Sequence, residues 1–132
     1  FPAAQSAPPL AMETLRTPAT RKSLRHDLID GVTEYLIEDD AGRSRHVGSG
    51  METDDRLMER YTVREGAPLS LQVHIERTLE LQRDEWRIRV ETLSTMTADA
   101  THFHVSNHLD AYEGDVRVFT RSRELAIPRH LV

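Results

Sequence analysis

The sequence predicts an all-β domain, an antiparallel up-and-down meander of about seven or eight strands in a strongly curved sheet or partly closed barrel. Three observations support this fold class. Apolar and polar residues alternate over successive runs, most clearly in residues 85–127. Turn-forming residues separate the runs, and the connections between runs are short. Alternation places successive side chains on opposite faces of a strand, and short connections favour antiparallel pairing.

The N-terminal segment, residues 1–20, differs from the rest of the chain. It holds four of the six prolines. Proline fixes φ and has no N–H donor, which favours extended, polyproline-like chain over sheet or helix. We therefore expect a strap or linker over residues 1–20 and the antiparallel β-domain over residues 21–132. The sequence begins with Phe rather than Met, which suggests a piece of something longer.

The first half of the β-domain is expected to contain a hairpin followed by a second turn. Strands over residues 23–29 and 32–38 flank Asp30-Gly31, a dipeptide suited to a two-residue turn. Residues 39–42 provide the next turn, which leads into a strand over residues 43–47.

After the interruption at Gly48-Ser49-Gly50, the sequence has two interpretations. Residues 51–60 contain good helix formers, but we favour a strand from about Arg56 to Arg64, with Leu57, Tyr61 and Val63 on one side.

The second half shows the clearest alternation. Apolar residues recur at every second position from Leu69 to Leu81, interrupted only by Arg77. A strand of this length would span roughly 40 Å, and long strands bend or coil, which is why we expect curvature. Three further strands follow, separated by turns near residues 82–84, 97–100 and 113–115, and Pro128 is expected to end the last one.

Composition excludes several function classes. Hydrophobic residues make up 38% and charged residues 30%, so we expect a thin core and an extensive solvated side. The net charge of −5 argues against a nucleic-acid partner. The lack of cysteine removes disulfides, thiolate catalysis and Cys-ligated zinc. No apolar run is long enough to span a bilayer, so we expect no membrane partner, and the cytoplasm is the simplest location.

Four histidines are the candidates for a metal site. His102, His104 and His108 share one face of an expected strand with Asp110, and His74 could supply a ligand from a neighbouring strand. Side chains at alternate positions lie about 6.6 Å apart, which lets two imidazoles converge on one ion. The same face carries Arg, Glu and Gln, which favours a solvated surface. We therefore assign no metal ligand and no cofactor.

No catalytic residue is assigned. Ser49 lies in Gly48-Ser49-Gly50, which lacks the Gly-x-Ser-x-Gly pattern of a nucleophile elbow and favours a hairpin loop. The acidic pairs Asp39-Asp40 and Asp54-Asp55 are expected in turns, where Asp is favoured for its side-chain hydrogen bonds.

Five arginines could form a basic stripe across adjacent strands, but interleaved acids favour cross-strand ion pairs. They are Arg87, Arg89, Arg117, Arg121 and Arg123, interleaved with Glu91, Asp115 and Glu124. Arg77 interrupts the longest apolar run and either reaches the sheet edge or pairs at an interface. Trp86, the single tryptophan, is expected to anchor the core.

A series of short elements in residues 83–132 resembles the extreme C-terminal part of a family of bacterial hydrolases. The elements are Trp86-Arg87-Ile88-Arg89, residues 96–100, Phe103-His104, residues 109–115, Val118-Phe119 and residues 127–129. The family is the cocaine esterase and X-prolyl dipeptidyl-peptidase superfamily of α/β-hydrolases. The proline-rich segment and residues 39–43 are also similar to sequences of this group.

The resemblance implies a parent enzyme with a Ser-His-Asp triad in an α/β-hydrolase domain, a helical cap and a β-jelly-roll. This chain would be an additional all-β extension, and no triad residue of the family falls on it. We therefore expect a non-catalytic accessory domain that packs on the catalytic portion or mediates homo-oligomerisation. The alternative is a small calycin-like module that binds an apolar ligand, suggested by the long apolar run of residues 69–81.

Overall fold

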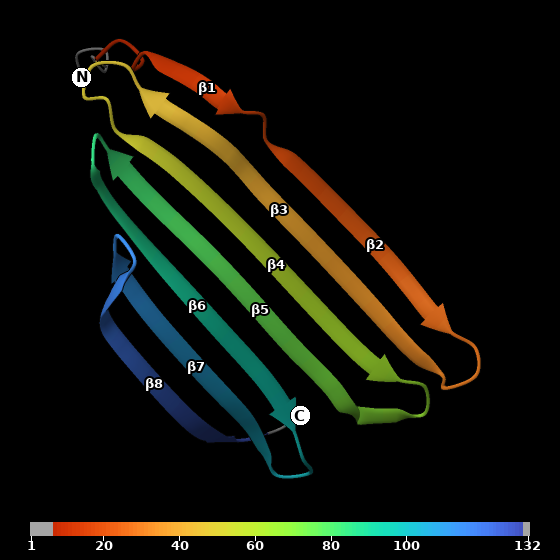
Figure 1. The fold of residues 1–132 in the computed structure, drawn as a ribbon. Coiled ribbons are helices and arrows are strands. Elements are labelled where there is room, and N and C mark those ends of the chain that lie inside the picture. Colours follow the sequence, from red (N-terminus) through yellow and green to blue (C-terminus); the bar gives the residue numbers. More distant parts are fainter. Residues whose placement is uncertain (1–6, 131–132) are drawn as a thin grey trace, which may run out of the picture.

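The computed structural model describes residues 7–130 and consists of eight strands in a single antiparallel sheet (Figure 1). The strands are β1 (Met12–Arg16), β2 (Ala19–Asp27), β3 (Val32–His46), β4 (Glu52–Arg64), β5 (Ala67–Arg83), β6 (Trp86–Ala98), β7 (His102–Glu113) and β8 (Val116–Pro128). The predicted all-β, up-and-down meander is confirmed. None of the described residues lies in a helix that could cross a membrane.

From β3 to β8 the strands are ordered in the sheet as they are in the chain. β1 and β2 both pair with β3 and together form the edge beside it. β1 pairs with the C-terminal part of β3 around Ser44, and β2 pairs with its N-terminal part, from Ala19 opposite Asp40 to Asp27 opposite Val32. Figure 1 shows β1 and β2 following one another along β3. The sheet is therefore open, with β1 and β2 along one edge and β8 along the other.

The expected turn at residues 39–42 is wrong, because β3 runs through this segment with a bulge between Asp40 and Arg43. Gly42 adopts a φ of 79° and its N–H donates to the Asp40 carboxylate at 2.8 Å. A bulge uses the same residue types as a turn, since both need a left-handed residue and a local acceptor. The chain therefore bends here without reversing.

The second acidic pair is also placed differently from the prediction. Asp54 and Asp55 lie inside β4, not in a turn. The favoured strand over residues 56–64 is confirmed and begins earlier, at Glu52, and the helical alternative for residues 51–60 does not form.

The first hairpin has a longer turn than Asp30-Gly31 alone. β2 ends at Asp27, whose carboxylate accepts the N–H groups of Ile29 at 2.9 Å and Asp30 at 3.1 Å. Gly31 has a φ of 63° and donates its N–H to the Asp27 carbonyl. Because Asp27 satisfies the backbone of the turn, the chain leaves the sheet earlier than alternation indicates.

Strand boundaries in the second half agree closely with the prediction. β5 covers the whole apolar run, and Pro128 is the last residue of β8. At the N-terminus the sheet already begins at Met12, inside the segment expected as a strap, while residues 1–6 of that segment lie outside the described residues.

A single sheet gives this chain no closed core. Among residues 7–130 no hydrophobic side chain is fully buried. Apart from Gly42 at the bulge, the one buried residue in this range is Asp54, at 4% exposure. The thin core expected from the composition is thus reduced to contacts within one layer. Both faces of the sheet therefore stay uncovered by the described residues, and the more apolar of the two becomes the main functional candidate.

Candidate docking face

One face of the sheet, called the apolar face, is defined by a row of paired residues from β3 to β8. Paired residues of neighbouring antiparallel strands point to the same side of a sheet. The row consists of Tyr35, Tyr61, Val73, Met96, Val105 and Leu125. The two tyrosine rings stack with centroids 6.2 Å apart. The opposite side is called the polar face.

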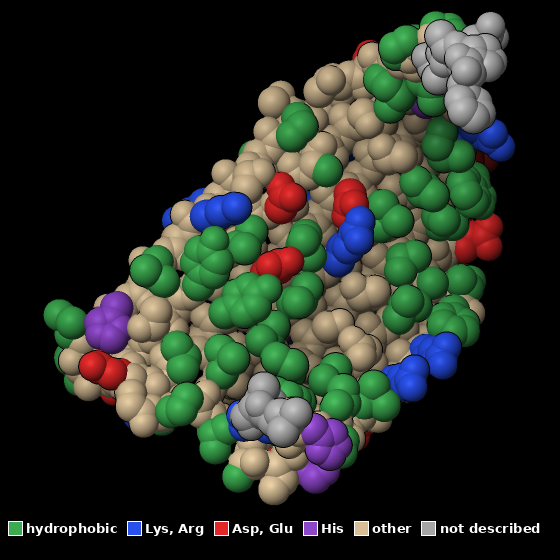
Figure 2. All heavy atoms as spheres, turned by 180° about the vertical axis from the view of Figure 1, so that it is seen from behind, with side chains coloured by type: hydrophobic (Ala, Val, Ile, Leu, Met, Phe, Trp, Pro, Cys, Tyr) green, Lys and Arg blue, Asp and Glu red, His purple; other side chains and the backbone are tan. Residues whose placement is uncertain are grey.

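A second apolar row lies further along the strands on the same face. It runs from Leu79 on β5 through Val90 and Ala111 to Phe119 on β8. Figure 2 shows the molecule from behind, with hydrophobic side chains spread over the whole surface and a few acidic and basic side chains among them. The strong alternation of β5 therefore produces a broad uncovered apolar surface.

Exposure of large side chains confirms that nothing within the described chain covers this face. Phe119 is 51% exposed and Ile127 46%. Trp86, expected as a core anchor, is 42% exposed, because no second layer packs over β6 among residues 7–130. The prediction for Trp86 is wrong within this chain, although its position on the apolar face is as expected.

The total accessible surface measures how much covering is missing. It is 9980 Å² for the chain. A compact monomer of 15.1 kDa exposes about 7,100 Å², so the excess is about 2,900 Å². A standard interface covers about 800 Å² per partner, and obligate interfaces cover more. Both faces of the single layer contribute to this excess, so the covering that the apolar face lacks is a part of it.

Two polar rows cross the middle of the apolar face and separate the apolar ones. The first contains Asp39, Leu57, Arg77, Thr92, Leu109 and Arg121, and the second contains Ile37, Glu59, Ile75, Ser94, Asn107 and Arg123. Arg77 donates to the Asp55 carboxylate at 2.9 Å, so this arginine pairs within the sheet and does not reach its edge.

The remaining charges of these two rows are distributed unevenly. Glu59 on β4 accepts from the Tyr61 hydroxyl at 2.8 Å, which raises the pKa of Tyr61, and Asp39 on β3 accepts from the Thr20 hydroxyl at 2.7 Å. Neither acid has a cationic partner in the described part of the chain. Arg121 and Arg123 on β8 likewise have no acidic partner among residues 7–130. These two rows therefore have unpaired acids on β3 and β4 and unpaired arginines on β8.

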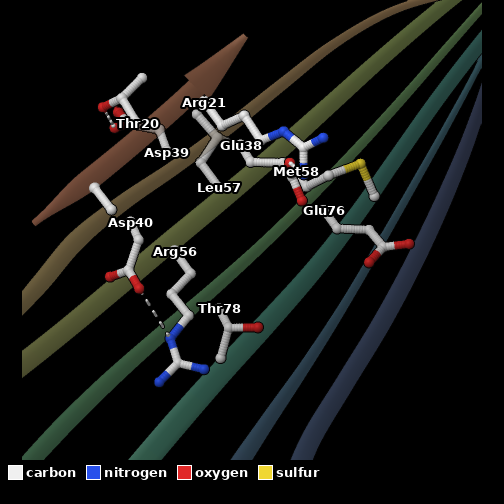
Figure 3. Close-up of a pocket in the computed structure, with 11 residues that line it drawn as sticks. Thr20, Arg21, Glu38, Asp39, Asp40, Arg56, Leu57, Met58, Glu76 and Thr78 are labelled. Atoms are coloured by element: carbon white, nitrogen blue, oxygen red, sulfur yellow. Dashed lines mark hydrogen bonds and ion pairs between the residues drawn. The ribbon is translucent and has the colours of Figure 1, made fainter. Parts of the chain in front are cut away.

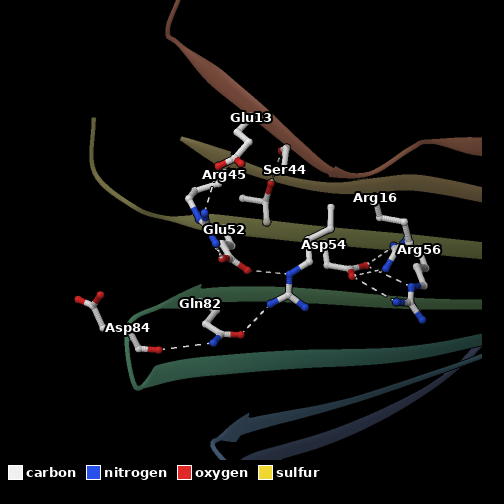
Figure 4. A network of polar contacts seen from close by, with 11 residues as sticks. Glu13, Arg16, Ser44, Arg45, Glu52, Asp54, Arg56, Gln82 and Asp84 are labelled. Carbon is white, nitrogen blue, oxygen red and sulfur yellow. Dashed lines mark hydrogen bonds and ion pairs between the residues drawn. The ribbon is translucent and has the colours of Figure 1, made fainter. Parts of the chain in front are cut away.

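The polar face, by contrast, contains a dense ion network centred on Asp54 (Figure 4). Arg16 donates to both carboxylate oxygens of Asp54, at 2.7 and 2.8 Å, and to Asp40 at 2.6 Å. Arg56 approaches Asp54 at 3.1 Å. These hydrogen bonds from Arg16 hold the pKa values of Asp54 and Asp40 below their usual range. The network joins β1, β3 and β4 at the bulge.

A second group of ion pairs continues along the polar face. Glu52 accepts from Arg45 at 2.6 Å and from Arg43 at 2.8 Å, and these bonds lower its pKa. Arg45 also reaches Glu13 at 3.0 Å, which ties β1 to β3. The sequence pattern did not indicate this network, because the acidic pairs that contain Asp40 and Asp54 are typical of turns. Alternating Arg and Asp on paired strands was the signal that could have revealed it.

The five arginines that could have formed a basic stripe are split between the two faces. Arg87 pairs with Asp115 at 2.7 Å, as predicted, whereas Arg89 pairs with Glu91 of its own strand at 3.0 Å and Arg117 pairs with Asp110 at 3.5 Å, an acid outside the predicted set. Arg121 and Arg123 do not form such pairs, because the bulge between Ala111 and Tyr112 shifts the register and places these two on the apolar face.

A depression of about 380 Å³ lies mainly on the polar face of β2 to β5 (Figure 3). Most of its charged side chains are paired: Arg56 lies 4.0 Å from Asp40 and Arg21 lies 3.8 Å from Glu38, while Asp39 accepts from the Thr20 hydroxyl. The depression is therefore a groove lined by ion pairs.

The four candidate histidines do not converge. The rings of His102 and His104 lie 6.2 Å apart, and His104 contacts Asp99 at 2.7 Å, which lowers the pKa of Asp99. His108 contacts Asp110 at 3.2 Å, and His74 contacts Glu76 at 2.6 Å on β5, with β6 between it and β7. Within residues 7–130 no group of three His, Cys, Asp or Glu side chains is arranged to hold a metal ion.

Ser49 lies in the hairpin turn between β3 and β4, as the glycine pattern favoured. Its hydroxyl lies 2.7 Å from His46 Nδ1, and its own N–H donates to the same nitrogen at 3.1 Å. A serine beside a histidine resembles two parts of a triad, but the backbone contact makes this pair a turn-closing motif. A strand-turn-helix elbow does not surround it.

Comparisons with protein-family models, curated proteins and solved structures find no match for this chain. They therefore provide no link to the cocaine esterase and X-prolyl dipeptidyl-peptidase superfamily, and the resemblance stays a prediction. The geometry of the two faces is accordingly the main evidence about function.

Proposed function

We propose that this chain is a non-catalytic accessory β-domain of a serine hydrolase that acts on ester or amide bonds. It packs on the catalytic part of that protein, or mediates its oligomerisation, through the apolar face. The observation that carries the proposal is the apolar face itself, on which Trp86, Phe119 and Ile127 are about half exposed, in a sheet without one fully buried hydrophobic side chain in the described residues. A layer of secondary structure must cover an apolar sheet face for a stable domain.

The hydrolase part of the proposal depends on the short elements that resemble the C-terminal region of the esterase superfamily. These elements lie largely on β6, β7 and β8, the strands that supply much of the apolar face. A cytoplasmic location is proposed with it, since the chain contains no cysteine that would gain from an oxidising compartment.

Hydrolysis of p-nitrophenyl esters tests the non-catalytic role. The purified chain is expected to show no rate above that of buffer, and Ser49→Ala is expected to behave identically. Ester hydrolysis that disappears in Ser49→Ala would refute the proposal, because it would make the Ser49 and His46 contact a working nucleophile and base.

The reading frame upstream of Phe1 tests the parent enzyme. A Gly-x-Ser-x-Gly sequence between a predicted strand and helix, some hundreds of residues earlier, is the expected result. A frame that encodes no α/β-hydrolase pattern would remove the hydrolase part of the proposal.

The second candidate function is a calycin-like module for an apolar ligand, and the apolar face is the observation in its favour. Because the sheet is open, a ligand would lie on a surface and would not be enclosed by a barrel. Titration with a fluorescent apolar probe distinguishes the two. Saturable binding with a fixed stoichiometry favours the module, whereas weak, unsaturated binding favours an uncovered docking face.

A further inference from the structure

We propose that the apolar face is covered by the same face of a second copy of this chain, in a twofold β-sandwich. This inference rests on the proposed docking role of the face and names its occupant. Three features of the face support it: its size, the order of its rows and the separation of its unpaired charges.

Size restricts the possible occupants. The apolar face spans six strands, β3 to β8, spaced about 4.8 Å apart, so it is about 24 Å wide, whereas a helix with its side chains is about 10–12 Å across and covers only part of it. An equally broad apolar sheet can cover it, with the two sheets about 10 Å apart as in sandwich folds. A second copy has such a surface by necessity.

The order of the rows determines which twofold axis brings the faces together. An axis parallel to the strands and between β5 and β6 places β3 over β8, β4 over β7 and β5 over β6 of the other copy. This rotation keeps every row opposite its own counterpart. The row of Tyr35 and Leu125 then packs on itself in reverse order, so apolar residues meet apolar residues.

The same rotation pairs the unpaired charges. Asp39 and Arg121 stand at opposite ends of one row, and each therefore lies over the other in the second copy. In the next row Glu59 on β4 lies over Asn107 on β7, beside Arg123. A twofold interface repeats each contact, so the acids of both copies gain cationic partners.

The alternative in-plane axis, perpendicular to the strands, is disfavoured by the same charges. It places β8 over β8, so Arg121 and Arg123 would face the identical arginines of the other copy. Like charges facing one another across an interface are strongly unfavourable. Lys22 does not change this comparison, because β2 faces no strand under the parallel axis, whereas the perpendicular axis places β2 over β2, whose side chains on this face include no acid.

The test uses a pair of reciprocal charge-reversed variants of the full chain. Arg121→Glu with Arg123→Glu gives acids at both sides of the face, and Asp39→Arg with Glu59→Arg gives arginines at both sides. Each variant alone is expected to raise the dimer dissociation constant about 100-fold or more, because like charges then meet. A 1:1 mixture is expected to form a heterodimer, since every meeting pair becomes opposite in charge.

Analytical ultracentrifugation gives the molar mass. The wild-type chain and the mixture are expected at twice the monomer mass of 15.1 kDa, and each variant alone at the monomer mass. Trp86 is a second readout, since its emission should shift to shorter wavelength in every dimeric sample as the half-exposed ring becomes covered. Arg21→Glu with Arg25→Glu, the same charge change on the polar face of β2, is the control and should remain dimeric.

Two outcomes overturn the inference. One is a wild-type chain that stays monomeric up to its solubility limit, and the other is a dimer that both reversed variants form as tightly as the wild type. Far-UV circular dichroism checks that the variants fold, and recovery in the mixture checks it independently.

The two proposals fail in different ways. A chain that dimerises although its reading frame encodes no hydrolase keeps this inference and removes the proposed function. A chain that stays monomeric and binds the separately expressed hydrolase domain keeps the proposed function and removes this inference.

Discussion

The two faces of this sheet are made by the same strands but differ in how many of their side chains have partners within the chain. On the polar face, ion pairs connect most strands, and the network at Asp54 includes the single buried charged side chain of the described residues. On the apolar face, large hydrophobic side chains are exposed and Arg121 and Arg123 have no acidic partner among residues 7–130. Alternation alone therefore does not decide on which face the side chains find partners within the chain.

The free energy of unfolding of the isolated chain should therefore depend on the ion pairs of the polar face and on the hydrogen bonds between strands. The contribution of the apolar face should depend on whether a partner covers it. Four changes test this comparison, beginning with the largest expected effect.

Gly42→Ala should destabilise the chain most. A Cβ at this position would lie 2.3 Å from the Arg16 carbonyl oxygen and 2.9 Å from Pro18 N, and its φ is already left-handed. We expect a loss of about 3 kcal/mol or more in the free energy of unfolding, measured by urea denaturation. Gly66→Ala is the matched control, since Gly66 has a φ of 68° but nothing within 4 Å, and should lose only about 1 kcal/mol. Equal losses would show that the bulge is not closely packed.

Asp54→Ala should have the next largest effect. It removes the carboxylate that Arg16 and Arg56 share, and a lost buried partner typically destabilises by about 2–3 kcal/mol. Asp115→Ala removes an ion pair of the same type from a side chain that is 94% exposed, and should lose less than about 1 kcal/mol. If both variants unfold at the same urea concentration, the network at Asp54 contributes no more than a surface pair.

Leu79→Ala and Leu93→Ala compare the faces directly. Both leucines are half-buried, but Leu79 lies on the apolar face and Leu93 on the polar face. In dilute solution each truncation should reduce the free energy of unfolding by about 1 kcal/mol, less than in a closed core. At concentrations where the apolar face is covered, only the Leu79 effect should grow. Thermal denaturation over a range of protein concentrations measures this, and parallel behaviour would remove the distinction between the faces.

Lowering the pH should reduce the free energy of unfolding by a small amount, because it protonates carboxylates of the polar face. The folded pKa values of Asp40, Asp54 and Glu52 lie below the ordinary values of 3.8 and 4.5, so the unfolded chain binds protons first. Their contribution is therefore complete above about pH 5 and is lost as the pH falls through the folded pKa values. Urea denaturation between pH 7 and pH 3 should show this decline, and Asp54→Asn should show a shallower one. An identical decline in this variant would exclude Asp54 as a source.

Much of the fold could be predicted because apolar and polar residues alternate over most of β5, β6 and β7 and because short turns separate β5 to β8. The errors concern acidic residues and glycine. Asp39-Asp40-Ala41-Gly42 has the composition of a turn, and only the pairing of β3 with β1, β2 and β4 makes it a bulge. Asp54-Asp55 likewise has the composition of a turn, because nothing local shows that Arg16 will reach Asp54 from β1.

The candidate site was predictable only in part. Alternation correctly indicated that residues 69–81 would produce an apolar face, but it indicated a core there. The exposure of Trp86 and Phe119 follows from the absence of a second layer over the described residues, which no local pattern shows. The side on which Arg121 and Arg123 lie depends on a bulge in the pairing of β7 with β8.

Period-two alternation and short connections were enough to predict an antiparallel meander, the strands from β5 to β8 and the long apolar run of β5. Only the tertiary structure decided that the sheet stays open, that an ion network forms around Asp54 and that acids and arginines separate across the apolar face. These features depend on register between strands distant in sequence. A one-residue shift in register moves every later side chain to the other face, so they exist only once the sheet has formed.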